Sequence, residues 1–483
     1  MRKSVRPSAD FSLLEPFWNE TVERTVLPNG LTLIIKPDAA STIASVQVWV
    51  KTGSVHEGSK LGAGLSHYLE HMLFKGTERR AGREISTVVQ AHGGYINAYT
   101  TFDRTVYYID IPGEHVGVAV DVLADAVLHS TLPAGEVEKE KQVILREIAM
   151  GQDDPDNRLF EALFQTAFRQ HPYRHPIIGY RDVFAALSRE DLVAYYKSRY
   201  VPNNLVVVVA GGVEPSAVRA LVQQHFGGEP RRELAPVYIP DESPALAPRR
   251  LHREEEVEVT RAGLAWPIPG LAHADAAALD VLATIFGQGD SSILWQAIRE
   301  KRRLVHSIDA TSWNPGSCGL FYISFTCDAG RREAATAAIQ DECARWLRRG
   351  FSAAQVRKAV RQMVVSEINA RKTVAGQASR LGVAEVVVGD LDHSRTYFEA
   401  LRRVTLADLQ RVLGTYLDAS RITAVSIDPT PKPTPAAAPR SAVAERKAEW
   451  QEQTLPNGAR LLLQPDRRLP NLHLRLLCAG CPV

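Results

Sequence analysis

Cysteine is scarce in this chain, which carries five among 483 residues. The odd count leaves at least one thiol without a partner in the chain, and Cys318, Cys327 and Cys343 are too scattered to indicate a disulfide scaffold. Cys478 and Cys481 form a lone C-x-x-C. Without a second such pair this motif is weak evidence for a zinc or redox site.

Long apolar runs and an excess of one charge are also missing. No stretch approaches the roughly 20 apolar residues that span a membrane, and residues 1–20 lack the apolar run of a secretory signal. Lys plus Arg number 57 and Asp plus Glu 55, a balance that argues against nucleic-acid binding by bulk electrostatics. We expect a soluble cytoplasmic protein with no membrane span and no nucleic-acid partner. A periplasmic location is the alternative.

Strand and helix patterns occur in two similar blocks of the sequence. Helices separated by strand pairs favour an α+β fold of two similar domains, residues 15–230 and 250–428, each a mostly antiparallel sheet covered by helices. The predicted strands are 31–35, 44–50, 95–111 (a hairpin), 205–210, 263–266, 307–327 and 422–427, and the main predicted helices are 62–74, 116–128, 134–150, 274–286 and 291–302.

The end of the chain resembles its beginning. Residues 429–449 are rich in Pro and Ala and predict an extended linker. Beyond them, LPNGARLLLQPD at 455–466 matches LPNGLTLIIKPD at 27–38 in seven of twelve positions, and 471–481 corresponds loosely to 44–54. We therefore expect residues 450–483 to begin a further repeat that is cut short, leaving an unpaired edge strand.

The motif H-x-x-E-H lies on the predicted helix 62–74. His67, Glu70 and His71 fall on one helix face, and leucines occupy the opposite face. Two imidazoles one turn apart can bind one zinc ion, and a carboxylate between them can accept a proton from an attacking water. The alternative to a zinc site is a chance match of this motif on a solvated helix face. His171 and His175 share the i,i+4 spacing, but neighbouring prolines make them loop residues.

A zinc site of this kind needs a third protein ligand. The predicted helix 134–150 offers four acidic candidates, most of which also suit ion pairs with nearby Lys and Arg. Glu147 differs because its sequence neighbours are apolar, where a carboxylate is costly unless it is paired or bound to metal. The candidates are Glu136, Glu138, Glu140 and Glu147.

These motifs together resemble the pitrilysin family of zinc metallopeptidases, which includes enzymes like the mitochondrial processing peptidase. The resemblance covers most of residues 20–428 and rests on these segments, in this order: GLSHYLEHMLFKGT, GGYINAYTTFDRTVYY, HPYRHPIIGY, YVPNNLVVVVAG and GQGDSSILWQAIREKRRLVHSI. It implies Glu147 as the third zinc ligand, with Glu140 acting beside it in catalysis.

The resemblance also implies where substrate binds. Residues 94–100 would be an edge strand to which a peptide adds, with Asn97 and Ala98 near the cleaved bond. The alternative is a plain strand with a structural Asn. Arg299 matches a family arginine that holds the substrate, but His306 stands where the family has a tyrosine. An imidazole titrates near neutral pH, so activity would depend more on pH.

The sequence therefore predicts a zinc-dependent endopeptidase with one Zn²⁺ per site, acting on peptides or unfolded protein segments. The two domains would face each other around a chamber, and the chain would act as a homodimer or pair with a second half of the same type. The alternatives are a non-catalytic partner or scaffold subunit, and a regulatory or structural metal site. A structural zinc usually has cysteine ligands, and none lies near this motif in sequence.

Overall fold

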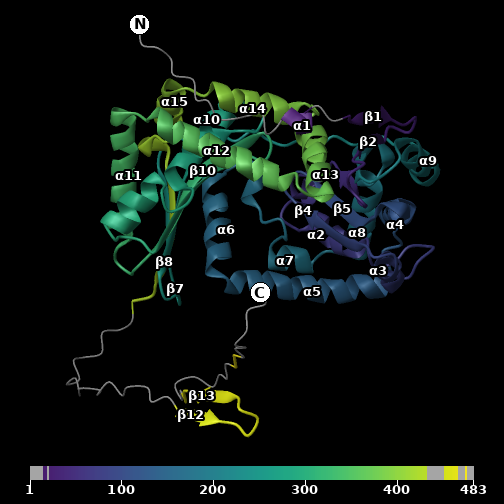
Figure 1. Ribbon diagram of the computed structural model, residues 1–483, viewed down its shortest axis with the longest axis horizontal. Coiled ribbons are helices and arrows are strands. Elements are labelled where there is room, and N and C mark those ends of the chain that lie inside the picture. Colours follow the sequence, from purple (N-terminus) through teal and green to yellow (C-terminus); the bar gives the residue numbers. More distant parts are fainter. Residues whose placement is uncertain (1–14, 19–20, 432–450, 466–473, 476–483) are drawn as a thin grey trace. The chain divides into compact units, whose positions relative to one another are not determined.

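The computed structural model describes residues 15–18, 21–431, 451–465 and 474–475. The chain divides into two compact units, Met1–Thr430 and Pro431–Val483. The first unit contains two mixed β-sheets with helices packed on them, which confirms the predicted α+β class (Figure 1). Within the described ranges, no helix combines the length and apolarity needed to cross a membrane.

The first sheet has six strands in the order β1-β2-β6-β3-β5-β4. Neighbours are antiparallel except for β2 and β6, which run parallel. β6 is buried along its whole length because both faces of the sheet are covered, which explains its continuous apolar sequence. The strands are β1 (Glu23–Val26), β2 (Thr32–Pro37), β3 (Ile43–Val50), β4 (Tyr95–Thr100), β5 (Thr105–Pro112) and β6 (Leu205–Gly211).

The second sheet repeats this topology without a counterpart of β1. Its order, β7-β11-β8-β10-β9, again places the last strand beside the first in a parallel pair. Sequence analysis missed β7 because its sequence, RRLHREE, is charged, as suits an exposed sheet edge. The strands are β7 (Arg249–Glu255), β8 (Thr260–Pro269), β9 (Ser307–Trp313), β10 (Cys318–Cys327) and β11 (Thr423–Pro429).

The two halves exchange helices. α6 (Pro155–Ala167) packs on β8 and β11 of the second sheet, and α13 (Val374–Val383) packs on β3 and β6 of the first. Gly382 of α13 lies against Trp49, where a Cβ atom would come within 2.1 Å of the indole ring. This exchange fixes each half on the other. α5 (Ala134–Asp153) directly precedes α6 and packs against the first half.

Other helices pack on the sheets or on one another. Those of the first half are α2 (Leu65–Met72), α3 (Gly82–Ala91), α4 (Val116–Leu128), α7 (Arg181–Ala185), α8 (Arg189–Arg199) and α9 (Pro215–Phe226). Those of the second are α10 (Ala276–Gly287), a π-helix at Trp295–Lys301, α11 (Arg332–Arg349), α12 (Ala353–Ala370), α14 (His393–Arg403) and α15 (Leu406–Tyr416).

The second unit repeats the opening hairpin of the first. β12 (Gln451–Thr454) and β13 (Arg460–Leu463) pair in the register of β1 and β2 shifted by 428 residues, since Gln451 faces Leu463 as Glu23 faces Ile35. The repeated turn glycines, Gly30 and Gly458, have φ of 87° and 84°.

The predicted domain limits stay predictions. Residues 471–473 and 476–481, with Cys478 and Cys481, and most of the linker lie outside the described residues.

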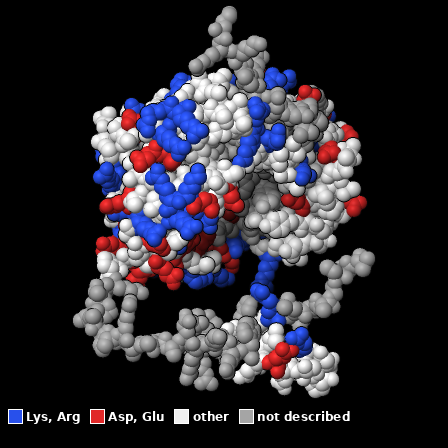
Figure 2. All heavy atoms as spheres, turned by 60° about the vertical axis from the view of Figure 1, so that its left-hand side comes forward, with Lys and Arg blue, Asp and Glu red and all other residues white. Residues whose placement is uncertain are grey.

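Charges of both signs are interspersed on the surface shown in Figure 2. Lys and Arg side chains lie beside Asp and Glu side chains across this face, in keeping with the formal net charge of +2.

Candidate active site

The helix that carries the H-x-x-E-H motif is α2, and it begins later than the sequence predicts. Gly64 precedes it with a left-handed φ of 75°, and a Cβ atom there would meet the Ile178 carbonyl oxygen at 2.1 Å. Only glycine fits this close approach. Leu65, Leu69 and Met72 of α2 are buried in the core of the first half, so the helix orientation is fixed by its apolar face.

A buried carboxylate holds the start of α2. The Glu57 side chain accepts hydrogen bonds from the backbone amides of Gly64 (3.1 Å) and Ser66 (2.9 Å). These amides belong to the first turn of the helix, where they have no partner within the helix. Burial raises the pKa of Glu57 to about 7, against the lowering effect of these bonds. Glu57 therefore helps to fix the helix one residue before His67.

The neighbouring His56 makes stability depend on pH. Burial, together with the charge of Arg199, lowers the pKa of His56 to about 4. Between about pH 6.5 and pH 4 the unfolded chain therefore binds a proton that the folded chain excludes. The unfolding free energy is therefore not reduced by His56 above pH 6.5, and it falls as the pH drops from 6.5 towards 4.

We expect His56→Gln to flatten the pH dependence of stability in the zinc-free protein. The slope of unfolding free energy between pH 6.5 and 4.5 should decrease by up to about 1.4 kcal/mol per pH unit, the contribution of one proton. Urea unfolding at several pH values measures this slope. An unchanged slope would contradict the assignment.

Three predicted ligands converge at one point. Donor atoms of His67, His71 and Glu147 all lie within 4.8 Å of one another. Carboxylate oxygens of Glu147 are 3.8 Å from His67 Nε2 and 3.7 Å from His71 Nε2. Two ligands about 2.1 Å from a tetrahedral ion lie about 3.4 Å apart, so the two Glu147 distances are slightly longer than those of a metal-bound cluster.

The protonation state of His67 and the orientation of His71 suit metal binding. Burial, with a contribution from His71, lowers the pKa of His67 to about 3, so this ring is neutral at physiological pH. His71 Nδ1 is 3.0 Å from Glu140 Oε2, which orients the ring and leaves Nε2 towards Glu147. Among the described residues the cluster holds two imidazoles and one carboxylate, which leaves a fourth position open, as in catalytic rather than structural zinc sites.

The structure reverses the expected burial of the two glutamates on α5. Glu147, predicted to lie among apolar side chains, is 47% exposed, whereas the Glu140 side chain is 10% exposed. Glu140 and Glu147 are seven residues apart and lie on nearly the same helix face, so the difference comes from their surroundings. Glu140 is enclosed beside Lys75 and His71, whereas Glu147 is exposed beside the two imidazoles. Burial raises the pKa of Glu140, but bonds from Lys75 (2.6 Å) and His71 outweigh it and hold the pKa below its usual range.

We expect Glu140→Gln to weaken zinc binding by about 10- to 100-fold without abolishing it, because the group orients a ligand and does not bind the metal. Titration with a competing chelator measures the affinity. Glu138→Gln, on the exposed face of the same helix, is the matched control. A loss as large as that caused by removing a ligand would contradict this role.

Glu70 lies beside the cluster and contacts the edge strand. Thr100 Oγ1 of β4 donates a 2.6 Å hydrogen bond to Glu70 Oε2. Burial raises the pKa of Glu70, and this bond offsets part of the rise. The carboxylate is thus held in place and made more basic than an exposed glutamate, as general-base catalysis requires.

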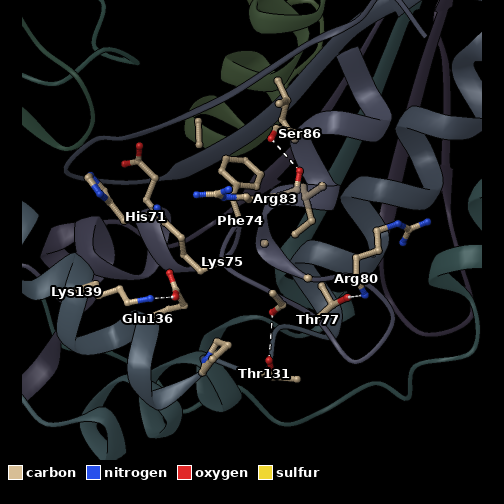
Figure 3. Close-up of a pocket in the computed structure, with 18 of the residues that line it drawn as sticks. His71, Phe74, Lys75, Thr77, Arg80, Arg83, Ser86, Thr131, Glu136 and Lys139 are labelled. Carbon is tan, nitrogen blue, oxygen red and sulfur yellow. Dashed lines mark hydrogen bonds and ion pairs between the residues drawn. The ribbon is translucent and has the colours of Figure 1, made fainter. Parts of the chain in front are cut away.

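Two cavities border the site. One, of about 1020 Å³, is lined by Glu70, His71, Asn97 and Ala98 together with residues of α3 (Figure 3). The other, of about 760 Å³, is lined by His67 and Glu147 and reaches Trp313 and Tyr322 of the second sheet. The latter lies between the halves, as the predicted chamber would. β4 is the free edge of its sheet, so Asn97 and Ala98 lie where the sequence placed them.

Two predicted substrate-binding residues are not brought to this site. Arg299 Nε donates to the His306 carbonyl (2.8 Å), and the guanidinium lies 4.2 Å from the centre of the Trp295 ring. His306 Nε2 is 3.0 Å from Asp328. Neither residue lines either cavity, so their role stays a prediction. His171 and His175 flank a short 3₁₀ turn and lie outside the metal cluster, as their prolines indicated.

Sequence comparison identifies the family. Residues 32–181 match the family described as insulinase (peptidase family M16), and residues 186–363 match the peptidase M16 inactive domain. A protein of Mycobacterium leprae named as an uncharacterized zinc protease is 34% identical over 368 residues, 76% of this chain and 82% of its own length.

This chain belongs to peptidase family M16. An M16 relative from Mycobacterium tuberculosis, also named as an uncharacterized zinc protease, is 38% identical over 59% of this chain. That match spans 65% of the relative's length. The crystal structure of a protease from Helicobacter pylori superimposes with a TM-score of 0.81 at 24% identity, covering 85% of this chain and all of that one. It shows the same fold.

Proposed function

We propose that this M16 protein is a zinc-dependent endopeptidase that hydrolyses peptides or unfolded protein segments. The observation that carries the proposal is the convergence of His67, His71 and Glu147 with one position open, beside a buried Glu70 of raised pKa. This arrangement favours hydrolysis over a structural role, because a structural metal site would have a fourth protein ligand in place of the open position.

The residues take separate roles in the reaction. Bound zinc would supply Lewis acidity, activating water and polarising the carbonyl of the substrate. Glu70 accepts a proton from the attacking water and passes it to the leaving nitrogen as the C–N bond breaks. Thr100 orients Glu70, and Glu140 orients His71. The free edge of β4 binds the substrate backbone by strand addition, which tolerates varied side chains.

The test is hydrolysis of a mixed quenched-peptide library by the purified protein, with and without a chelator. Cleavage that stops on chelation and returns with zinc supports the proposal. Bound zinc without cleavage would favour the alternative, a non-catalytic partner subunit. Association of two chains and a cytoplasmic location stay predictions.

A further inference from the structure

The cavity of about 1020 Å³ beside His71 is lined by more cationic than acidic side chains, since the only acidic residues in its lining, among those the structure describes, are Glu70 and Glu136. Its apolar wall includes Phe74, Ile85 and Ile96, and its lining also contains four cationic side chains: Lys75, Arg80, Arg83 and Lys139. Figure 3 labels Phe74 and the four cations among the lining residues, and Arg83 comes from α3.

Three of the four cations are neutralised by neighbouring carboxylates. Lys75 pairs with Glu140 at 2.6 Å and Lys139 with Glu136 at 2.6 Å. Arg80 pairs with Asp121 and, at 2.5 Å, with Asp125. These cations hold the walls of the cavity together and have little charge left for a ligand.

Arg83 differs from the other three. Within the described part of the chain its guanidinium has no hydrogen bond, ion pair or ring contact. The dashed line to Ser86 in Figure 3 ends on the backbone oxygen of Arg83. Arg83 is exposed, and its unpaired guanidinium in the lining of a partly apolar cavity attracts a carboxylate, which it can bind through two parallel hydrogen bonds.

We propose that this cavity receives an acidic side chain of the substrate, Asp or Glu, from a position adjoining the cleaved bond, and that Arg83 determines this preference. The inference rests on the proposed function, because a strand added along Asn97 and Ala98 would carry its side chains past the cavity mouth. The apolar wall accommodates the methylene stem of the acid. A Lys or Arg side chain would meet a like charge.

The preference can be tested without catalysis. Two pools of short fluorescent peptides, with variable positions drawn from Ala and Glu or from Ala and Lys, are titrated into zinc-loaded Glu70→Gln protein and the same protein carrying Arg83→Glu. The Glu pool should bind about 10-fold tighter than the Lys pool, and Arg83→Glu should abolish or reverse this ratio. Arg79→Gln is the control, since Arg79 pairs with Asp121 and does not line the cavity.

A ratio near one in the parent protein, or one that Arg83→Glu leaves unchanged, would overturn the inference. Cleavage by the protein with an intact Glu70 is measured separately on the same pools. Cleavage without acidic preference would refute the role of Arg83 and leave the proposed function standing. Acid-selective binding without cleavage would support the role of Arg83 and refute the proposed function.

Discussion

Replacing Glu70 with Gln is expected to lower kcat/KM for peptide hydrolysis by about 1000-fold while zinc stays bound. The amide has the shape of the carboxylate and can still accept the hydrogen bond from Thr100, but it cannot accept a proton from water. Because Glu70 is not one of the three converging ligands, the metal affinity should change little. Steady-state kinetics and metal analysis of the same sample measure both quantities.

The control for this substitution is Glu138→Gln, which removes one carboxylate from an exposed position of α5. It should retain the activity of the parent protein. Equal activity in Glu70→Gln would assign the proton transfer to another group. Loss of both zinc and activity would make Glu70 part of the metal site.

Replacing Glu147 with Gln is expected to weaken zinc binding by roughly 10³-fold, because it removes one of three protein ligands and its charge. Activity should be lost at low zinc and partly restored at high zinc. Since Glu147 is exposed and lies outside the core, folding should be preserved. Competitive chelator titration gives the affinity, and circular dichroism checks the fold.

A graded series is the sharpest form of this experiment. The loss of zinc affinity should rank Glu147→Gln above Glu140→Gln, with Glu138→Gln unaffected. If Glu140→Gln costs more than Glu147→Gln, then Glu140 is the ligand and the geometry of the cluster has been misassigned.

Much of the site could be predicted from the sequence, because it depends on helical periodicity. The i,i+4 spacing of His67 and His71 places both rings on one face of α2, whose opposite face is buried. Burial around a single glutamate was harder to predict. Apolar sequence neighbours suggested that Glu147 is enclosed, but it is exposed, and Glu140, on nearly the same face of the helix, is enclosed by its contacts with Lys75 and His71.

Features that depend on long-range packing could not be predicted. The hydrogen bonds that Glu57 accepts from the first turn of α2 depend on a loop in which Gly64 passes close to the Ile178 carbonyl. The exchange of α6 and α13 between halves has no local signature. Nor could the sequence show that Arg299 would contact Trp295 and His306 rather than line a cavity.

The most direct test of the account is stepwise zinc titration of the chelator-stripped protein while peptide cleavage is recorded. Activity should rise in proportion to added zinc and stop rising at one zinc ion per chain. Cleavage that persists in the stripped protein, or zinc uptake that saturates without any cleavage, would contradict it.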